Sequence, residues 1–367
     1  MKIERIILSG GGTGGHIFPA LAIANEIRNR YPEAEILFVG ALGRMEMEKI
    51  PAAGYKIIGL PIIGFPRTLS FKIISFFVKL FKSISMALKI VNDFKPQIAI
   101  GVGGYASAPL LWAAARKKIP TLIQEQNSYA GVTNKILGKK ANTVCVAYHN
   151  MERFFPAGKI TFTGNPVREN LVQNQSDKTE ALAYFGLHET VKVLLITGGS
   201  LGARSINNAV LAGIDLIAKS DITVIWQTGT LYYNQILKEL EERKPANLQI
   251  HQFISRMDLA YQLADVVISR AGAGTISELC LLGKPSILVP SPNVAEDHQT
   301  KNAQALVEKE AAVMIRDSEI YEILLPEAIK LINDEAKCNR LSAQIKTLAK
   351  PNATKDIVDE AEKIICK

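Results

Sequence analysis

Cysteine is scarce in this 367-residue chain, and its four cysteines are far apart. Cys145, Cys280, Cys338 and Cys366 form no Cys-x-x-Cys pair. This spacing disfavours both a structural zinc site and a disulfide framework, and it is typical of a protein from a reducing cytosol.

Long uncharged apolar runs are also missing. None approaches the roughly 20 residues that a membrane-spanning helix needs. A short apolar stretch near the start is interrupted by glycines at positions 10–12, which disfavours a secretory signal. With 48% apolar residues the chain can still build sizeable cores. We therefore expect a cytosolic protein, or one that lies on a membrane from the cytosolic side.

Acidic side chains are few in the first half of the chain. Residues 1–165 hold 21 Lys and Arg against 9 Asp and Glu, a net charge of +12, whereas residues 166–367 carry a net −4. Surplus lysines can serve solubility alone, but an imbalance of this size indicates an anionic partner. A phospholipid surface or a phosphorylated substrate fits. Nucleic acid is disfavoured, because aromatic residues do not alternate with the basic ones.

Short apolar, β-branched runs alternate with helical segments along the whole chain. This alternation predicts right-handed βαβ units and an α/β fold of two doubly wound domains with parallel sheets. Gly164 and Pro166 mark the boundary, so the predicted domains are residues 1–165 and 166–350, followed by a helix at residues 351–367. The predicted strands cover residues 6–8, 36–39, 57–58, 98–101, 121–123, 144–146, 193–196, 223–226, 248–250, 266–268 and 287–289.

Each predicted domain begins with a strand, a glycine-rich loop and a helix. Such a loop lets backbone N–H groups approach a phosphate at a helix N-terminus. Gly10, Gly12 and Gly15 match Gly-x-Gly-x-x-Gly, but the second strand ends at residues 38–41 without the carboxylate that an NAD ribose needs. No Gly-Lys-Ser/Thr follows either loop, which disfavours a P-loop. The ligand that these loops still predict is one that carries a diphosphate but no nicotinamide.

Several polar residues follow predicted strands, where open α/β sheets bind ligands. His16 can act as a general base or be a capping residue. Glu125 and Asn127 follow another strand, in a ligand-binding or an ordinary loop. Glu278 can accept hydrogen bonds from ribose hydroxyls or merely complement a helix dipole. No cluster has metal-ligand spacing, so we expect neither a catalytic metal nor a cofactor.

The segment from Leu69 to Val91 is expected to form an amphipathic helix. The polar residues Lys72, Ser75, Lys79, Lys82, Ser83 and Lys89 fall within about a third of the helical circumference, and a wide apolar face occupies the remainder. The helix is either an ordinary buried one or an interfacial one that meets an anionic membrane surface.

The ordered motifs of the chain resemble a known family. The motifs are residues 11–20, 103–105, 125–127, 164–168, 198–200 and 270–278. Together they are similar to those of the bacterial N-acetylglucosaminyltransferases of glycosyltransferase family 28, which act in peptidoglycan synthesis. The resemblance covers nearly the whole chain. It implies a GT-B fold whose two Rossmann-like domains face a cleft, with the C-terminal helix returning to the first domain.

The resemblance also implies the reaction. N-acetylglucosamine would move, with inversion, from UDP-N-acetylglucosamine to the 4-hydroxyl of undecaprenyl-diphosphate-muramyl-pentapeptide, giving lipid II. The first domain would bind the acceptor on the cytoplasmic face of the inner membrane, as a peripheral protein, and the second would bind the donor. Residues implied in substrate binding are Thr13, Gly14, Gly15, Asn127, Arg168, Ser200, Ile254, Ala273, Gly274, Thr275, Ile276, Ser277, Glu278 and Gln299.

The candidate catalytic residues are His16 as the base, with Asn127 or Glu125 orienting the nucleophile. Two positions depart from the family pattern. His298 precedes Gln299 where some members have two glutamines, and Leu201 stands where glutamine is common. Two alternative functions remain open: transfer to another glycolipid, and a non-enzymatic, membrane-bound sensor of nucleotide sugars.

Overall fold

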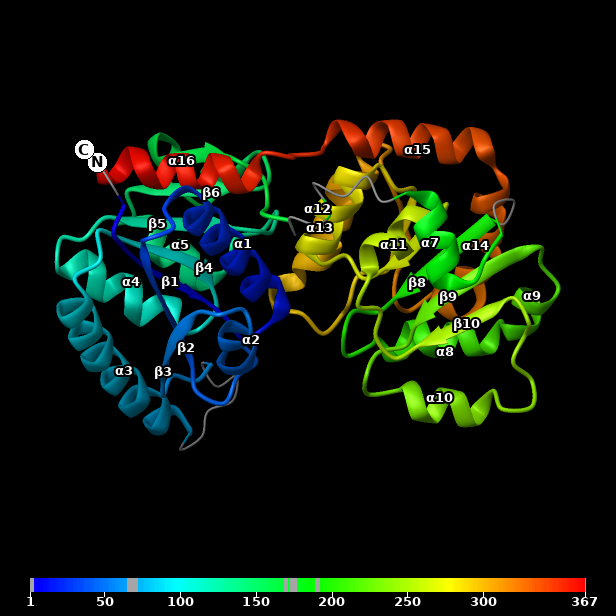
Figure 1. Cartoon of the computed structure of the whole chain (residues 1–367), viewed down its shortest axis with the longest axis horizontal. Coiled ribbons are helices and arrows are strands. Elements are labelled where there is room, and N and C mark those ends of the chain that lie inside the picture. The colour runs from blue at the N-terminus through cyan, green and yellow to red at the C-terminus, as the bar shows by residue number, and fades with distance from the viewer. Residues whose placement is uncertain (1–2, 65–71, 168–170, 172–176, 189–191, 367) are drawn as a thin grey trace. The chain divides into compact units, whose positions relative to one another are not determined.

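The computed structural model describes residues 3–64, 72–167, 171, 177–188 and 192–366. The chain forms two compact units (Figure 1). Unit 1 comprises Met1–Arg168 and Lys350–Lys367, and unit 2 comprises Glu169–Ala349. The C-terminal segment thus belongs to the same unit as the N-terminus.

Unit 1 contains a seven-stranded parallel sheet in the order β3-β2-β1-β4-β5-β6-β7. Its strands are β1 (Arg5–Gly10), β2 (Glu35–Ala41), β3 (Lys56–Leu60), β4 (Ile98–Gly103), β5 (Thr121–Glu125), β6 (Thr143–Val146) and β7 (Ile160–Phe162). Its helices are α1 (Gly14–Arg30), α2 (Glu46–Ala52), α3 (Lys72–Phe94), α4 (Ser107–Arg116), α5 (Val132–Gly138) and α16 (Ala353–Ile365), with short 3₁₀ turns η1 (Met151–Arg153) and η2 (Ala157–Lys159).

Helices cover both faces of this sheet, which explains why its central strands are almost entirely apolar. Ile6 and Leu8 of β1 pack in a core with α1 and α16, whereas Ile7 packs in a second core with α3 and α4 (Figure 1). Successive side chains of a strand point to opposite faces, so one apolar run serves two cores. Arg30 of α1 forms an ion pair with Glu362 of α16 at 3.0 Å, which fastens the C-terminal helix to α1.

Unit 2 contains a six-stranded parallel sheet in the order β10-β9-β8-β11-β12-β13. Its strands are β8 (Lys192–Thr197), β9 (Ile222–Gln227), β10 (Leu248–His251), β11 (Val266–Ser269), β12 (Ser286–Leu288) and β13 (Val313–Met314). Its helices are α7 (Lys178–Phe185), α8 (Arg204–Ala212), α9 (Ile214–Ala218), α10 (Tyr233–Glu239), α11 (Met257–Leu263), α12 (Ala273–Leu282), α13 (His298–Val307), α14 (Ile320–Asn333) and α15 (Glu335–Thr347), with the 3₁₀ turn η3 (Ala295–Asp297).

The predicted α/β fold is confirmed, and each predicted strand is present. The edge strands β7 and β13 were not predicted, because they are only three and two residues long. The last helix begins at Ala353, two residues after Pro351.

The helix predicted at residues 69–91 is α3, and its first residues, 69–71, lie outside the described part of the chain. One detail of its predicted polar face is wrong, because Ser83 is fully buried. Ser83 lies on the same side of the helix as the buried residues Ala87 and Val91, and α3 packs closely against α4. Small side chains allow this close approach. Four large apolar residues of α3, Ile74, Phe77, Val78 and Phe81, are exposed instead.

Candidate functional site

In both units the strand order reverses beside the first strand. β1 lies between β2 and β4 in unit 1, and β8 lies between β9 and β11 in unit 2. Loops that leave two such neighbouring strands turn to opposite faces of the sheet, which leaves room for a ligand at the carboxyl ends. The predicted site residues of each unit follow its strands at this edge.

His16 is the third residue of α1 and is half-buried. Its Nδ1 lies 3.0 Å from the carbonyl oxygen of Gly11 and 3.4 Å from the hydroxyl of Thr13. A carbonyl oxygen only accepts hydrogen bonds, so this contact is a hydrogen bond when Nδ1 carries the proton. In the neutral ring the lone pair is then on Nε2, which is the form that a general base requires.

Two glycines at the end of β4 make room for this loop. Gly103 and Gly104 have φ values of 105° and 92°, in the left-handed region that favours glycine. A Cβ on Gly103 would lie 2.8 Å from Nε2 of His16, and one on Gly104 would overlap the carbonyl of Gly11. The Gly103-Gly104 motif therefore fits closely under the histidine and its loop.

Glu125, the last residue of β5, is buried, and burial raises the pKa of its carboxyl. The carboxylate accepts hydrogen bonds from the N–H of Asn127 (3.1 Å), the N–H of Gly131 (3.0 Å) and the amide of Asn134 (2.9 Å). These contacts hold the Asn127 loop in shape. Both oxygens of Glu125 thus bond to the loop that carries Asn127.

The other predicted residues of unit 1 lie on the same edge or outside the described residues. Gly14 and Gly15 form the first turn of α1, and Thr13 precedes it as an exposed residue whose side chain makes no capping bond. Arg168 lies outside the described residues.

In unit 2, α12 begins directly after β11 and carries most of the predicted donor-binding residues. Glu278 is buried, and its Oε2 accepts a hydrogen bond of 3.1 Å from the hydroxyl of Tyr261. Ser277 donates back to the carbonyl of Ala273 at 2.9 Å. Gly274 and Thr275 are half-buried in the first turn, while Ile276 faces the core.

Three further predicted residues of unit 2 follow neighbouring strands. Ser200 is exposed on the loop after β8. The N–H of Ile254, after β10, donates to the side-chain oxygen of Gln227 at 2.8 Å. Gln299 is the second residue of α13, and its Oε1 accepts a bond of 2.8 Å from the N–H of Ser291.

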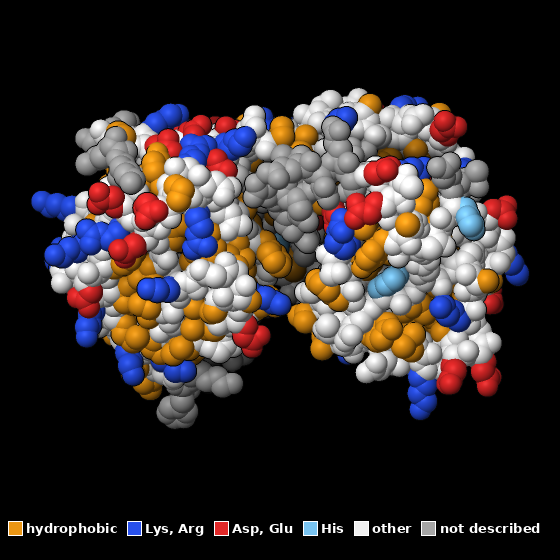
Figure 2. Space-filling view, viewed as in Figure 1, with side chains coloured by type: hydrophobic (Ala, Val, Ile, Leu, Met, Phe, Trp, Pro, Cys, Tyr) orange, Lys and Arg blue, Asp and Glu red, His pale blue; other side chains and the backbone are white. Residues whose placement is uncertain are grey.

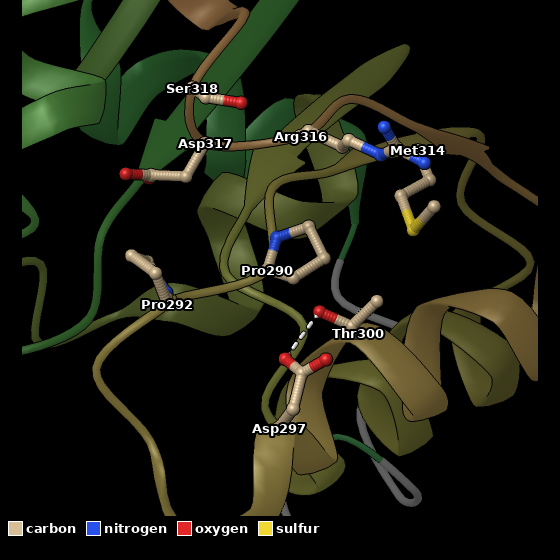
Figure 3. A pocket seen from close by; sticks show the side chains of 8 residues that line it. All are labelled: Pro290, Pro292, Asp297, Thr300, Met314, Arg316, Asp317 and Ser318. Carbon is tan, nitrogen blue, oxygen red and sulfur yellow. Dashed lines mark hydrogen bonds between the residues drawn. The ribbon is translucent and has the colours of Figure 1, made fainter.

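A pocket of about 300 Å³ lies beyond the ends of β12 and β13 (Figure 3). It is lined by Pro290, Pro292, Asp297, Thr300, Met314, Arg316, Asp317 and Ser318. None of these residues is among the substrate-binding residues that the family resemblance implies. Within the described residues, no three or more His, Cys, Asp or Glu side chains are grouped as metal ligands.

Three residues that hold predicted site residues or their loops in place were not predicted from the sequence. Glu46 accepts a bond from the N–H of Gly12, Tyr261 bonds to Glu278, and Gln227 bonds to the second glycine-rich loop. No motif singles them out. Each reaches its partner across 17 or more positions of the sequence, so only the fold brings the pairs together.

The chain is similar to known proteins over most of its length. Residues 6–146 match the glycosyltransferase family 28 N-terminal domain, and residues 193–360 match its C-terminal domain. A Parabacteroides distasonis protein named UDP-N-acetylglucosamine--N-acetylmuramyl-(pentapeptide) pyrophosphoryl-undecaprenol N-acetylglucosamine transferase is 58% identical over 367 residues, 100% of both chains. A Bacteroides fragilis protein of the same name is 54% identical, over 98% of this chain and 95% of its own.

Solved structures have the same fold. The crystal structure of Acinetobacter baumannii MurG matches with a TM-score of 0.78 and 28% identity, covering 98% of this chain and 99% of that one. The calicheamicin glycosyltransferase CalG4 matches in fold alone, with a TM-score of 0.73, 16% identity, and coverage of 100% and 99%. The chain belongs to glycosyltransferase family 28, and its fold is the GT-B fold of two Rossmann-like domains.

Proposed function

We propose that the chain transfers N-acetylglucosamine from UDP-N-acetylglucosamine to the 4-hydroxyl of undecaprenyl-diphosphate-muramyl-pentapeptide, with inversion at the anomeric carbon. The observation that carries the proposal is the end-to-end similarity to relatives named for this transfer, with 58% identity to one of them. The residues at the two sheet edges supply groups for both halves of such a reaction.

Unit 1 is proposed to bind the acceptor and to remove its proton. In an inverting transfer the acceptor oxygen attacks the anomeric carbon in one displacement, while a base takes the proton of its hydroxyl. The Nδ1–H tautomer of His16 has its lone pair on Nε2, as such a base requires. Asn127, held by Glu125, is proposed to orient the acceptor. Thr13, Gly14, Gly15 and Arg168 are proposed to contact substrate.

Unit 2 is proposed to bind the donor. Negative charge grows on the departing UDP, and the amides and dipole of the α12 N-terminus can stabilise it, with the hydroxyls of Ser200 and Thr275 nearby in the fold. Glu278 would accept hydrogen bonds from the ribose, and the uracil would meet the backbone near Ile254. The Oε1 of Gln299 is bonded to Ser291, so its NH₂ is the group proposed to donate to a sugar hydroxyl.

The outward face of α3 supports a membrane-surface role for unit 1. Ile74, Phe77, Val78 and Phe81 expose 64%, 46%, 61% and 69% of their surface. Exposed lysines such as Lys82 flank them, and Figure 2 shows hydrophobic side chains gathered on the face where α3 lies. Among the described helices, none is long and apolar enough to cross a membrane. We propose that this face rests on anionic lipid at the cytoplasmic side of the inner membrane, where the lipid-linked acceptor is held.

Binding to vesicles tests the membrane proposal. Phe81→Ser should reduce co-flotation with vesicles containing phosphatidylglycerol, whereas Tyr321→Ser, at a residue of unit 2 that is 64% exposed, should not. Equal loss in both variants, or in neither, would remove α3 from this role.

Turnover tests the function itself. Purified protein is mixed with UDP-N-acetylglucosamine and the undecaprenyl-linked acceptor, and released UDP is measured. UDP release that requires the muramyl lipid is expected, with little from UDP-glucose or ADP-sugars. Release with a different glycolipid would indicate another transferase, and binding of the donor without any release would indicate a sensor.

A further inference from the structure

Glu46, the first residue of α2, is a carboxylate that the proposed reaction leaves without a role. It is 1% exposed. Its Oε2 accepts a hydrogen bond of 2.8 Å from the N–H of Gly12, and its Oε1 accepts one of 3.0 Å from the N–H of Ala41. The carboxylate therefore links the end of β2 to the glycine-rich loop after β1.

Glycines make room for this carboxylate. A Cβ on Gly11 would overlap the carboxylate of Glu46, and a Cβ on Gly40 would lie 2.6 Å from its Cγ. The loop is built closely around the Glu46 side chain. A buried carboxylate is costly unless its oxygens accept hydrogen bonds, and here both do.

The peptide group that Glu46 binds is the same one that holds His16. The N–H of Gly12 and the carbonyl of Gly11 belong to one planar peptide unit, in which the two groups point in opposite directions. Glu46 accepts from its N–H, and Nδ1 of His16 lies 3.0 Å from its carbonyl oxygen. Fixing one end of the plane therefore fixes the other.

This peptide needs to be fixed, because glycines stand on both sides of it. Gly12 has a φ of 86°, and a Gly-Gly unit has more freedom to rotate its peptide plane than any other pair. Rotation would turn the carbonyl away from His16. The ring could then move its proton to Nε2, where it would no longer accept one from a hydroxyl.

We propose that Glu46 is a positioning residue for His16: it orients the Gly11–Gly12 peptide so that the imidazole keeps its proton on Nδ1 and its lone pair on Nε2. The proposal rests on the proposed function in one respect only: that function supplies the acceptor hydroxyl whose proton the Nε2 lone pair would take. The tautomer itself can be measured without any turnover.

The first experiment reads the histidine tautomer by ¹⁵N NMR of the full chain labelled at its five histidines. His16→Asn identifies the signal of His16. In the wild-type protein, above the titration of the ring, Nδ1 should be the protonated nitrogen. A wild-type His16 protonated on Nε2 would overturn the proposal without any variant at Glu46.

The second experiment changes the carboxylate. Glu46→Gln replaces one acceptor oxygen with an NH₂ that must face an N–H donor. We expect a shift of His16 toward the Nε2–H tautomer, a fall in kcat of tenfold or more, and a KM for UDP-N-acetylglucosamine within twofold of wild type. Glu48→Gln, at an exposed residue of the same helix, is the control and should change none of these.

The outcomes separate the two proposals. An unchanged tautomer with unchanged kcat in folded Glu46→Gln overturns the positioning role, and so does a raised donor KM with normal kcat. Glu46→Asp, which keeps a carboxylate on a shorter stem, should retain more turnover than Glu46→Gln, and the opposite order overturns the role. A tautomer shift in a protein that never releases UDP would uphold the positioning role and reject the proposed function.

Discussion

The two glycine-rich loops follow the first strand of each sheet, but they are supported by different chemistry. In unit 1 the loop after β1 gives the N–H of Gly12 to the carboxylate of Glu46. In unit 2 the loop after β8 is held by the neutral amide of Gln227, which donates to the carbonyl of Gly199 at 3.1 Å and to the hydroxyl of Thr197 at 3.1 Å. One loop is supported by a charged acceptor, the other by a neutral donor.

This difference bears on where a diphosphate can bind. A carboxylate repels a second anion close by, and the repulsion is strong where water is excluded. The loop of unit 1 matches Gly-x-Gly-x-x-Gly, yet Glu46 beside it disfavours a diphosphate there. The neutral support in unit 2 carries no such penalty. The glycine pattern alone therefore does not decide which loop binds phosphate, and we propose that the side chain beneath the loop does.

The largest effect is expected from removing the base. His16→Ala should lower turnover by about 10²- to 10⁴-fold, the usual contribution of a general base. Affinity for UDP-N-acetylglucosamine should change little, because Glu278 and the α12 N-terminus are untouched. Transfer rate and donor affinity are measured separately, the latter by calorimetry. Normal turnover would remove His16 from catalysis.

A matched pair of glycine substitutions distinguishes the effects of the two loops on kcat and on donor affinity. Gly104→Ala would overlap the carbonyl of Gly11, and Gly229→Ala would overlap the backbone of Gly202, both at positive φ. Such strain costs about 1–3 kcal/mol or more. We expect Gly104→Ala to lower kcat with donor affinity kept, and Gly229→Ala to lower donor affinity.

Thermal unfolding of both variants serves as the control. Each should keep a cooperative transition, and the effects should be compared only at temperatures well below it. If both substitutions change kcat and donor affinity in the same way, the expectation that one loop serves turnover and the other serves donor binding is wrong.

The sequence predicted the parts of this molecule that depend on local pattern. Continuous apolar runs predicted the central strands, because helices on both faces bury every residue of such a strand. The pattern failed where a segment is short, as in β13 (Val313–Met314), which pairs with β12 through two residues. It also failed at Ser83, because a small polar side chain can lie in a helix contact as well as on a polar face.

The candidate site shows the same limit. His16 and Glu278 were found because they follow glycine-rich loops at strand ends. Glu46 and Tyr261 were not, although each bonds directly to this machinery. Their partners lie in other segments of the fold, and a single sequence carries no signal for a contact that tertiary packing creates.

Replacing Gln227, whose side chain supports the loop after β8, tests directly whether a carboxylate beneath that loop weakens donor binding. Gln227→Glu puts a carboxylate under the loop of unit 2 and removes the donor to Gly199. Donor affinity should fall by about tenfold, equivalent to about 1.4 kcal/mol, the range of one lost hydrogen bond with added repulsion. Gln227→Met removes the hydrogen bonds without adding charge and should be the milder change. If the Gln227→Glu and Gln227→Met proteins have the same affinity for the donor, the electrostatic interpretation is wrong.

The smallest effect is expected at Tyr261, whose hydroxyl donates to Oε2 of Glu278 at 3.1 Å. Tyr261→Phe keeps the buried ring and removes only this hydrogen bond, which is worth about 0.5–1.5 kcal/mol. A less restrained Glu278 should bind UDP about two- to tenfold more weakly. Discrimination between UDP and 2′-deoxy-UDP should also narrow, whereas a general loosening of unit 2 would weaken both nucleotides equally. Because unit 1 is unchanged, kcat at saturating donor should stay within twofold of wild type. Glu278→Ala should have the larger effect of the two, and if it leaves UDP affinity intact, the carboxylate that Tyr261 holds is not the ribose ligand.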